Sequence, residues 1–431
     1  MPLSRSGVPE HGGAHRAPAG AGALLVTPAH RRHEAGDPPS FGLYLHVPFC
    51  SARCIYCDFN TYIDLHHLTE RYVRALVREI RLVGEMLDHR AAHTIFFGGG
   101  TPSLLKPAHV AAILDACAAA FALSSDVEIT LEANPESTTR ELLRALRHAG
   151  VNRLSLGVQS FDDGLLRFLG RLHTAHRAQE AVEWARAAGF DNINLDLMYG
   201  LPGQSEEMWR RSLDEALRLA PEHLSLYALT VEPGTPLHRH VTGGHVELPA
   251  DETAAAQYEW ARERLEAAGY AHYEISNWAR HQGEALTPSL ASRHNLLYWR
   301  NQEYAGLGAG AHSYVNSMRY ANLKRPEHYI AAVERGEIAD DVPAPALDPR
   351  TLDPIDPDLA MREHMILGLR LVREGVAFAD FERRHGVGLE ARFGRVIARL
   401  VADGWLEHLP DRVRLTRRSH LVANRVFVEF L

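Results

Sequence analysis

GLYLHVPFCSARCIYC, residues 42–57, joins a short apolar run to three closely spaced cysteines. The run at residues 42–47 has the length and composition of a buried β-strand, so the cysteines follow the carboxyl end of a strand. The whole chain has only four cysteines, which is too few for a disulfide framework and indicates metal binding in a reducing compartment. Cys50, Cys54 and Cys57 are therefore predicted to hold a metal centre.

Three thiolates with this spacing suit an iron–sulfur cluster better than a single ion. A 4Fe–4S cluster normally takes four thiolates, so three leave one iron free to bind a small molecule. The alternative is a zinc site, which needs a fourth ligand at short spacing. The pair His66-His67 lies close enough in sequence to provide one, and the chain would then be a zinc-stabilised binding module.

Outward from the cysteines, short apolar runs alternate with longer amphipathic segments. Strands are expected at residues 42–47, 93–97, 127–131, 153–157, 192–197 and 223–227. Helices are expected at residues 68–87, 107–121, 138–148, 174–188 and 205–219. This alternation predicts βαβ crossovers in an α/β fold, namely a partial (β/α)6 barrel of the TIM type. In such barrels the chemistry sits at the carboxyl ends of the strands, where the cysteines lie.

The composition divides the chain into four parts. Residues 1–40 mix Ala, Gly, Pro, Arg and His without periodicity and are predicted to be a disordered extension. Residues 41–340 would form the barrel and a ligand-binding segment after it, and residues 341–358 are rich in Pro and Asp and read as a linker. Residues 359–431 would form a winged-helix-like domain, with helices at 359–373, 377–385 and 389–402, a hairpin at 405–408 and 412–415, and a last helix.

The charge of the chain argues against nucleic acid as a partner. The formal net charge is −8, although the third C-terminal helix carries Arg392, Arg395 and Arg399. A winged helix in an acidic chain is more often a packing or substrate-covering module. No apolar run reaches the roughly 18 residues of a spanning helix. We therefore expect a cytoplasmic protein that acts on small molecules.

Glycine and polar side chains follow several of the expected strands. Gly98-Gly-Gly-Thr101-Pro-Ser103 comes directly after an apolar strand, where a backbone without Cβ atoms lets a ligand approach closely. Glu132, Gln159 and Asp196 lie at or near the ends of later strands. Because buried carboxylates and amides need partners, their convergence on one rim predicts a polar binding pocket.

These segments together resemble the oxygen-independent coproporphyrinogen III oxidase-like family of radical S-adenosylmethionine proteins. The resemblance runs from about residue 42 to the end. It rests on Tyr44-x-His46-x-Pro48-Phe49-Cys50, Gly98 to Ser103, Glu132-Ala-Asn134-Pro135, Gly157-Val-Gln159-Ser-Phe161, Leu169-Gly-Arg171-x-His173-Thr174 and Asp196-x-Met198-Tyr-Gly-Leu-Pro-Gly203.

The resemblance implies a 4Fe–4S cluster on the three cysteines, with S-adenosylmethionine on its open iron. It also implies which residues line the cofactor. Tyr44, Gly99 and Glu132 match positions beside the cofactor on the cluster. A second S-adenosylmethionine in the oxidase contacts the positions that match Tyr56, Gly100, Thr101, Gln159, Arg171, Asp196 and Ala228.

One residue separates the branches of this family. The oxidase carries a further cysteine two residues after the third, where this chain has Phe59. Cys57-Asp-Phe59 resembles instead the heme-chaperone branch, and His294-Asn-Leu-Leu-Tyr298-Trp299 resembles its heme-associated signature. This implies heme bound through His294, Tyr298 and Trp299, an apo-hemoprotein recipient and an electron donor for the cluster. No catalytic residue is assigned, and porphyrinogen decarboxylation stays the alternative activity.

Two further features have simpler interpretations. Gly306-x-Gly308-x-Gly310 lacks the strand, helix and downstream acid of a dinucleotide-binding fingerprint, so a glycine turn near the barrel rim is expected. Cys117 stands alone in an alanine-rich helical stretch and is predicted to be a small buried apolar residue.

Overall fold

The computed structural model describes residues 40–336 and 342–431. Apart from Ser40, the extension predicted for residues 1–40 lies outside the described residues. In the part of the chain that is described, no helix is long and apolar enough to cross a membrane.

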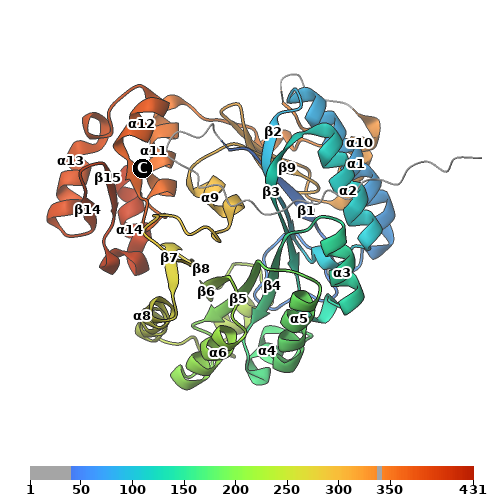
Figure 1. Cartoon of the computed structure of the whole chain (residues 1–431), viewed down its shortest axis with the longest axis horizontal. Coiled ribbons are helices and arrows are strands. Elements are labelled where there is room, and N and C mark those ends of the chain that lie inside the picture. Colours follow the sequence, from blue (N-terminus) through green and yellow to red (C-terminus); the bar gives the residue numbers. More distant parts are fainter. Residues whose placement is uncertain (1–39, 337–341) are drawn as a thin grey trace, which may run out of the picture.

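One large sheet forms the centre of the molecule (Figure 1). Its strands are β1 (Gly42–Val47), β2 (Ala91–Gly99), β3 (Ala122–Ala133), β4 (Arg153–Gln159), β5 (Ile193–Tyr199), β6 (His223–Ala228), β7 (Tyr270–Glu274), β8 (Asn277–Arg280), β9 (Tyr304–Leu307), β10 (His312–Val315), β11 (Met318–Ala321) and β12 (Asp353–Pro354). Their order is β12-β11-β10-β9-β1-β2-β3-β4-β5-β6-β8-β7. β1 to β6 are parallel, and the outermost strands β12 and β7 do not pair. The sheet is thus an open barrel, which confirms the predicted α/β fold.

Helices connect the strands and cover the outer side of the curved sheet, as α1 to α6 do in Figure 1. They are α1 (Thr69–Met86), α2 (Pro107–Ala120), α3 (Arg140–His148), α4 (Asp163–Leu169), α5 (Ala175–Ala187), α6 (Glu206–Arg218), α7 (Pro236–Thr242), α8 (Asp251–Ala267), α9 (Arg293–Trp299) and α10 (Pro326–Arg335). Side-chain oxygens cap several of them: Thr139, Thr174 and Ser205 each accept a bond from a backbone N–H in the first turn.

Side chains alternate along the parallel strands. Leu43, Leu45 and Val47 of β1 are buried in the hydrophobic core under the helices. The residues between them face the other side of the sheet, because successive side chains of a strand alternate. On β1 these are Gly42, Tyr44 and His46, and their register partners on β2 are Thr94, Phe96 and Gly98. The barrel interior is therefore lined by polar and aromatic side chains.

The C-terminal part has a core of its own. It contains α11 (Pro357–Gly368), α12 (Phe378–His385), α13 (Leu389–Ala402) and α14 (Ala423–Phe427), with a small sheet of β13 (Val376–Ala377), β14 (Leu406–His408) and β15 (Arg412–Leu415). β14 and β15 form the predicted hairpin. The helical C-terminal part of the fold prediction is confirmed, although its last helix is only five residues long.

The segment predicted as a linker packs on the barrel over residues 342–348, the first of its described residues. Val342, Ala344 and Ala346 are buried in the barrel core. In Val-Pro-Ala-Pro-Ala every second residue is a small apolar side chain, which suits an extended segment with one face against the core. β12 then pairs with β11 at the edge of the sheet.

Strands β9 to β12 extend the sheet on the β1 side and were not predicted. The glycine-rich segment 306–310 lies at the end of β9 and in the turn to β10. Gly308 has a φ of +102°, and a Cβ there would lie 2.7 Å from the carbonyl oxygen of His46. The glycine therefore permits close contact between this turn and the end of β1. Cys117 is fully buried in α2, as predicted.

Candidate functional site

Backbone hydrogen bonds hold the cysteine loop against the glycine turn after β2. The N–H of Gly100 donates to the carbonyl of Val47, and the N–H of Thr101 donates to that of Phe49, each at 2.8 Å. A Cβ at Gly100 would lie 2.6 Å from the Phe49 oxygen. Only glycine fits this contact, so the glycine turn packs against the cysteine loop itself.

The end of α4 supports the other side of the cysteine loop. Asp162 caps the start of α4 by accepting from two backbone N–H groups, and Gly170 ends it with a φ of +76°. The N–H of Ile55 donates to the carbonyl of Leu169 at 3.2 Å. A Cβ on Gly170 would lie 3.7 Å from the Cα of Cys54. This left-handed turn thus places residues 170–173 directly beside the second cysteine.

The three cysteines of the loop are free thiols and are partly buried. Burial raises the pKa of Cys50, while a hydrogen bond from Thr101 lowers it. Burial likewise raises the pKa of Cys57. A cation at the site would offset this cost, because thiolates are the form that binds metal.

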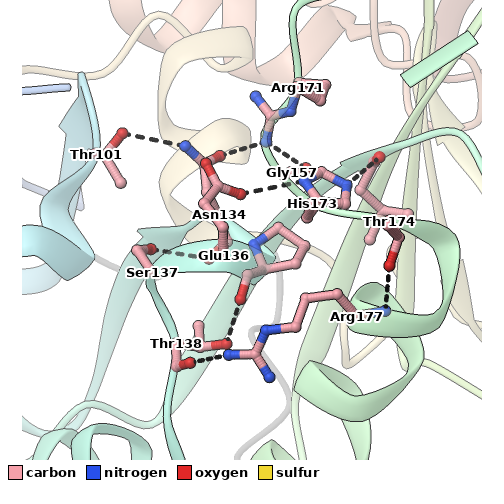
Figure 2. Close-up of polar contacts among 12 residues, drawn as sticks. Thr101, Asn134, Glu136, Ser137, Thr138, Gly157, Arg171, His173, Thr174 and Arg177 are labelled. Carbon is pink, nitrogen blue, oxygen red and sulfur yellow. Dashed lines mark hydrogen bonds and ion pairs between the residues drawn. The ribbon is translucent and has the colours of Figure 1, made fainter. Parts of the chain in front are cut away.

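Hydrogen-bond donors from two elements reach the sulfurs. The Thr101 hydroxyl donates to Cys50 Sγ and Arg171 Nη1 donates to Cys54 Sγ, each at 3.5 Å. Arg171 Nη2 also donates to Asn134 Oδ1 at 2.6 Å and to the carbonyl of Gly157 at 2.7 Å. Asn134 Nδ2 then donates to Thr101 Oγ1 at 3.1 Å (Figure 2). Thiolates that accept such bonds are the usual ligands of iron–sulfur clusters.

This set of bonds has a fixed direction. A guanidinium only donates, so the oxygen of Asn134 must face Arg171 and its amide nitrogen must face Thr101. The Thr101 oxygen accepts that N–H, which leaves its own proton for Cys50. The sequence alone predicts no role for Asn134, which stands in the motif Glu132-Ala-Asn134-Pro135. Its position two residues after Glu132, at the same strand end, was the available signal.

A buried histidine anchors the segment that carries Arg171. His173 is 4% exposed, and its Nδ1 lies 3.1 Å from Glu136 Oε2 and its Nε2 lies 3.1 Å from the Val158 carbonyl. The hydrogen bond from His173 helps lower the pKa of Glu136, although burial, the largest effect, opposes it. Arg177 also donates to the Thr138 carbonyl (Figure 2). These contacts tie residues 170–177 to the end of β3.

The donor set fits a cluster better than a zinc ion. Within residues 40–336 and 342–431, no three His, Cys, Asp or Glu side chains are arranged to hold one metal ion. His66, which the zinc alternative requires, has its Nε2 at 2.9 Å from the Cys50 carbonyl oxygen. Hydrogen bonds from N–H and O–H donors to the ligating sulfurs are typical of iron–sulfur clusters, and Cys50 and Cys54 each accept one here.

Two carboxylates lie on the interior side of the cysteine loop. Glu132 Oε2 accepts from the N–H of Gly99 at 3.3 Å. Burial, followed by the charge of Asp196, raises the pKa of Glu132 to about 8. Burial also raises the pKa of Asp196, which accepts from Asn194 Nδ2 at 2.8 Å. Tyr44 lies next to them, and its hydroxyl is 3.1 Å from His46 Nδ1. A cationic ligand would relieve the repulsion between the acids.

Other predicted cofactor residues lie around Glu132, Asp196 and Tyr44. Gln159 follows a register shift between β4 and β5 and has a φ of +65°. Tyr56 packs with Leu165 and Met198 beside the loop. Ala228 is the last residue of β6, the strand next to that of Asp196. All of these residues lie at or near the carboxyl ends of the strands, and the contacts above join Cys50, Cys54, Thr101 and Arg171 directly.

The predicted heme residues lie at the opposite ends of the strands. His294 is 1% exposed, and its Nδ1 is 2.7 Å from Thr94 Oγ1 and its Nε2 is 2.9 Å from the Tyr298 hydroxyl. Thr94 is the register partner of Gly42, the first residue of β1. With about 3.3 Å per strand residue, His294 therefore lies roughly 16 Å along β1 from the cysteine loop. Trp299 stacks under Arg370 of the C-terminal part, 4.1 Å from the guanidinium carbon.

Comparisons with known proteins agree with this geometry. The family model of the Radical SAM superfamily matches residues 44–216, and that of the HemN C-terminal domain matches residues 355–422. Among curated proteins, the chain is 41% identical over 394 residues to "Heme chaperone HemW" of Mycobacterium tuberculosis, covering 91% of this chain and 94% of the relative. It is 37% identical to the protein of the same name from Bacillus subtilis, covering 90% and 98%.

Among solved structures, coproporphyrinogen III oxidase (HemN) from Escherichia coli, described as a radical SAM enzyme, matches with a TM-score of 0.76. The match covers 95% of this chain and 92% of the oxidase at 23% identity. At that identity the likeness establishes the fold alone, including the open barrel and the C-terminal part.

Proposed function

The chain belongs to the HemW family of radical S-adenosylmethionine proteins, and from this premise we propose that it binds heme and delivers it to apo-hemoproteins. We further propose that Cys50, Cys54 and Cys57 hold a 4Fe–4S cluster. The observation that carries this proposal is the pair of donors, Thr101 and Arg171, on two of the three thiols. When bound, the cluster supplies electrons to a cofactor on its open iron.

The residues around the cluster have distinct roles in this proposal. Arg171 and Thr101 stabilise the thiolates and fix the loop. Glu132 attracts the positively charged part of S-adenosylmethionine on the cluster, and Tyr44 and Gly99 line the same space, whereas Asp196 would attract a second cofactor molecule. Gln159, Tyr56, Gly100 and Ala228 would face a second cofactor molecule. The free thiols require a reducing compartment, for which we propose the cytoplasm.

Heme is assigned to the helix α9. Both ring nitrogens of His294 already have hydrogen-bond partners, so iron ligation requires that the bond to Tyr298 or to Thr94 opens. Burial, followed by the charge of Arg153, lowers the pKa of His294 to about 3. The imidazole is therefore neutral at physiological pH, which is the form that ligates iron. Tyr298 and Trp299 would contact the porphyrin with their rings.

One anaerobic preparation tests the proposal. The protein is reconstituted with iron and sulfide, and both are quantified before hemin is added. We expect a cluster and a stable heme complex that passes heme to an apo-hemoprotein. In a parallel sample, coproporphyrinogen III and S-adenosylmethionine are added. Decarboxylation of the porphyrinogen without stable heme binding would refute the chaperone function and support the oxidase. Zinc without iron would support the binding module.

A further inference from the structure

Arg153 is a buried arginine on the interior side of the barrel. It is the first residue of β4, is 2% exposed, and pairs in register with Thr130 of β3. The next residue, Leu154, belongs to the core under the helices. Since side chains alternate along a strand, Arg153 points into the barrel on the same side as Ser155 and Gly157.

Among the described residues, the Arg153 guanidinium forms no hydrogen bond and no ion pair. Its Nε is buried without a hydrogen bond, and among residues 40–336 and 342–431 no carboxylate forms an ion pair with it. Leaving a buried cation unpaired costs several kcal/mol, so proteins pair or ligate such groups. Arg262 differs in its terminal nitrogens: its Nε is also buried without a partner, but its Nη atoms form an ion pair with Glu259 and donate to the Arg417 carbonyl at 3.2 Å.

The neighbouring acids form their hydrogen bonds with other groups and none with Arg153. Glu128 accepts from the backbone N–H groups of Arg293 and His294. Glu132 has a pKa of about 8, caused first by burial, and is mostly protonated at neutral pH. Asp196 accepts from Asn194 and Ser155. Within the described residues, Arg153 is therefore a buried cation to which no carboxylate is hydrogen-bonded.

Arg153 lies close to the helix to which heme is assigned. After burial, its charge is the next largest cause that lowers the pKa of both His223 and His294. By contrast, Gly157, whose carbonyl accepts from Arg171, lies four residues further along β4. At about 3.3 Å per residue, Arg153 is roughly 13 Å deeper in the barrel than that end. A cofactor on the cluster would remain at the carboxyl ends of the strands.

We propose that Arg153 binds a propionate carboxylate of the tetrapyrrole inside the barrel. This inference rests on the proposed heme-binding function and names the residue that recognises the ligand's acid groups. Arginine is suited to the role because its planar fork binds a carboxylate through two parallel hydrogen bonds. The same contact would supply the charge that Arg153 lacks.

The test compares hemin with its dimethyl ester, in which both propionates are blocked. Binding is measured by absorbance titration for the wild type, Arg153→Gln and Arg153→Lys. A charge-assisted pair contributes about 1.5–3 kcal/mol, so we expect Arg153→Gln to bind hemin about tenfold to 100-fold more weakly. Its affinity for the ester should equal that of the wild type, and Arg153→Lys should be intermediate. Circular dichroism verifies that each variant folds.

Arg262→Gln is the matched control, since it removes a buried arginine elsewhere and should leave hemin binding unchanged. Equal losses for hemin and the ester in Arg153→Gln, or no loss for either, would overturn the inference. So would a loss of S-adenosylmethionine affinity with hemin affinity intact, which would assign Arg153 to the cofactor's carboxylate. A wild type that binds neither hemin nor the ester would overturn the proposed function itself.

Discussion

Cofactor binding should depend on the ionisation of Glu132. Its pKa of about 8, raised first by burial and then by Asp196, means that at pH 7 roughly nine in ten molecules carry a protonated Glu132. A cationic cofactor binds better to the protein in which the Glu132 carboxylate is ionised. Below pH 8 its affinity should therefore rise about tenfold per pH unit through Glu132 alone, and the rise should level off above pH 8. In calorimetry at pH 7, the reconstituted wild type should release nearly one proton more than Glu132→Gln when it binds the cofactor.

Glu132→Gln is the control, because the glutamine is neutral at every pH. The cofactor's own amine must also lose a proton to ligate iron, so it adds a pH dependence that both proteins share. The ratio of wild-type to variant affinity isolates Glu132, and it should increase by about 25-fold from pH 6 to pH 7.5. A ratio that stays constant over this range would mean that Glu132 is already ionised or does not face the cofactor.

Three further predictions follow from the same structure. Thr101→Val removes the hydrogen-bond donor to Cys50 and should make the reduction potential of the cluster more negative in a titration without cofactor. Thr101→Ser keeps the donor and should retain the wild-type potential. If Thr101→Val has the same potential as the wild type, Thr101 does not tune the cluster. Gly170→Ala forces a Cβ into a left-handed turn and should lower the free energy of unfolding by about 1–2 kcal/mol in chemical denaturation. A change in the free energy of unfolding near zero would argue against that turn. Glu132→Gln should raise the melting temperature of the apoprotein much more at pH 8 than at pH 5. The pKa of Glu132 is higher in the folded state, so the wild type loses stability as pH rises from about 4.5 to 8. An equal gain at both pH values would contradict this.

The sequence was sufficient to predict the parallel strands and the cysteine loop. Each expected strand overlaps one of β1 to β6, because buried parallel strands have strongly apolar runs. The edge strands β9 to β12 were missed, since they have only two to four residues and a weak pattern. The sequence predicts a linker at the packed segment 342–347, because its prolines and the aspartates on either side of it outweigh its alternating apolar residues.

The polar lining of the barrel was available in the sequence but was read only at the strand ends. β3 has Glu128, Thr130 and Glu132 at alternate positions, and β4 has Arg153, Ser155 and Gly157. Which of these side chains lack partners depends on contacts between strands that are far apart in the sequence. Asn134 and Arg153 could therefore be recognised only in the folded chain.

The two ends of the barrel interior share one electrostatic environment. Arg153, near the helix of His294, helps lower the pKa of Glu132, near the cysteine loop, against the larger effect of burial. A carboxylate bound to Arg153 would neutralise this charge, so the pKa of Glu132 would rise and fewer molecules would present an ionised Glu132 to the cofactor. Because linkage is reciprocal, a cofactor that keeps Glu132 ionised would equally disfavour an anion at Arg153. Heme and S-adenosylmethionine would then weaken each other's binding, which is consistent with the proposed release of heme to a recipient.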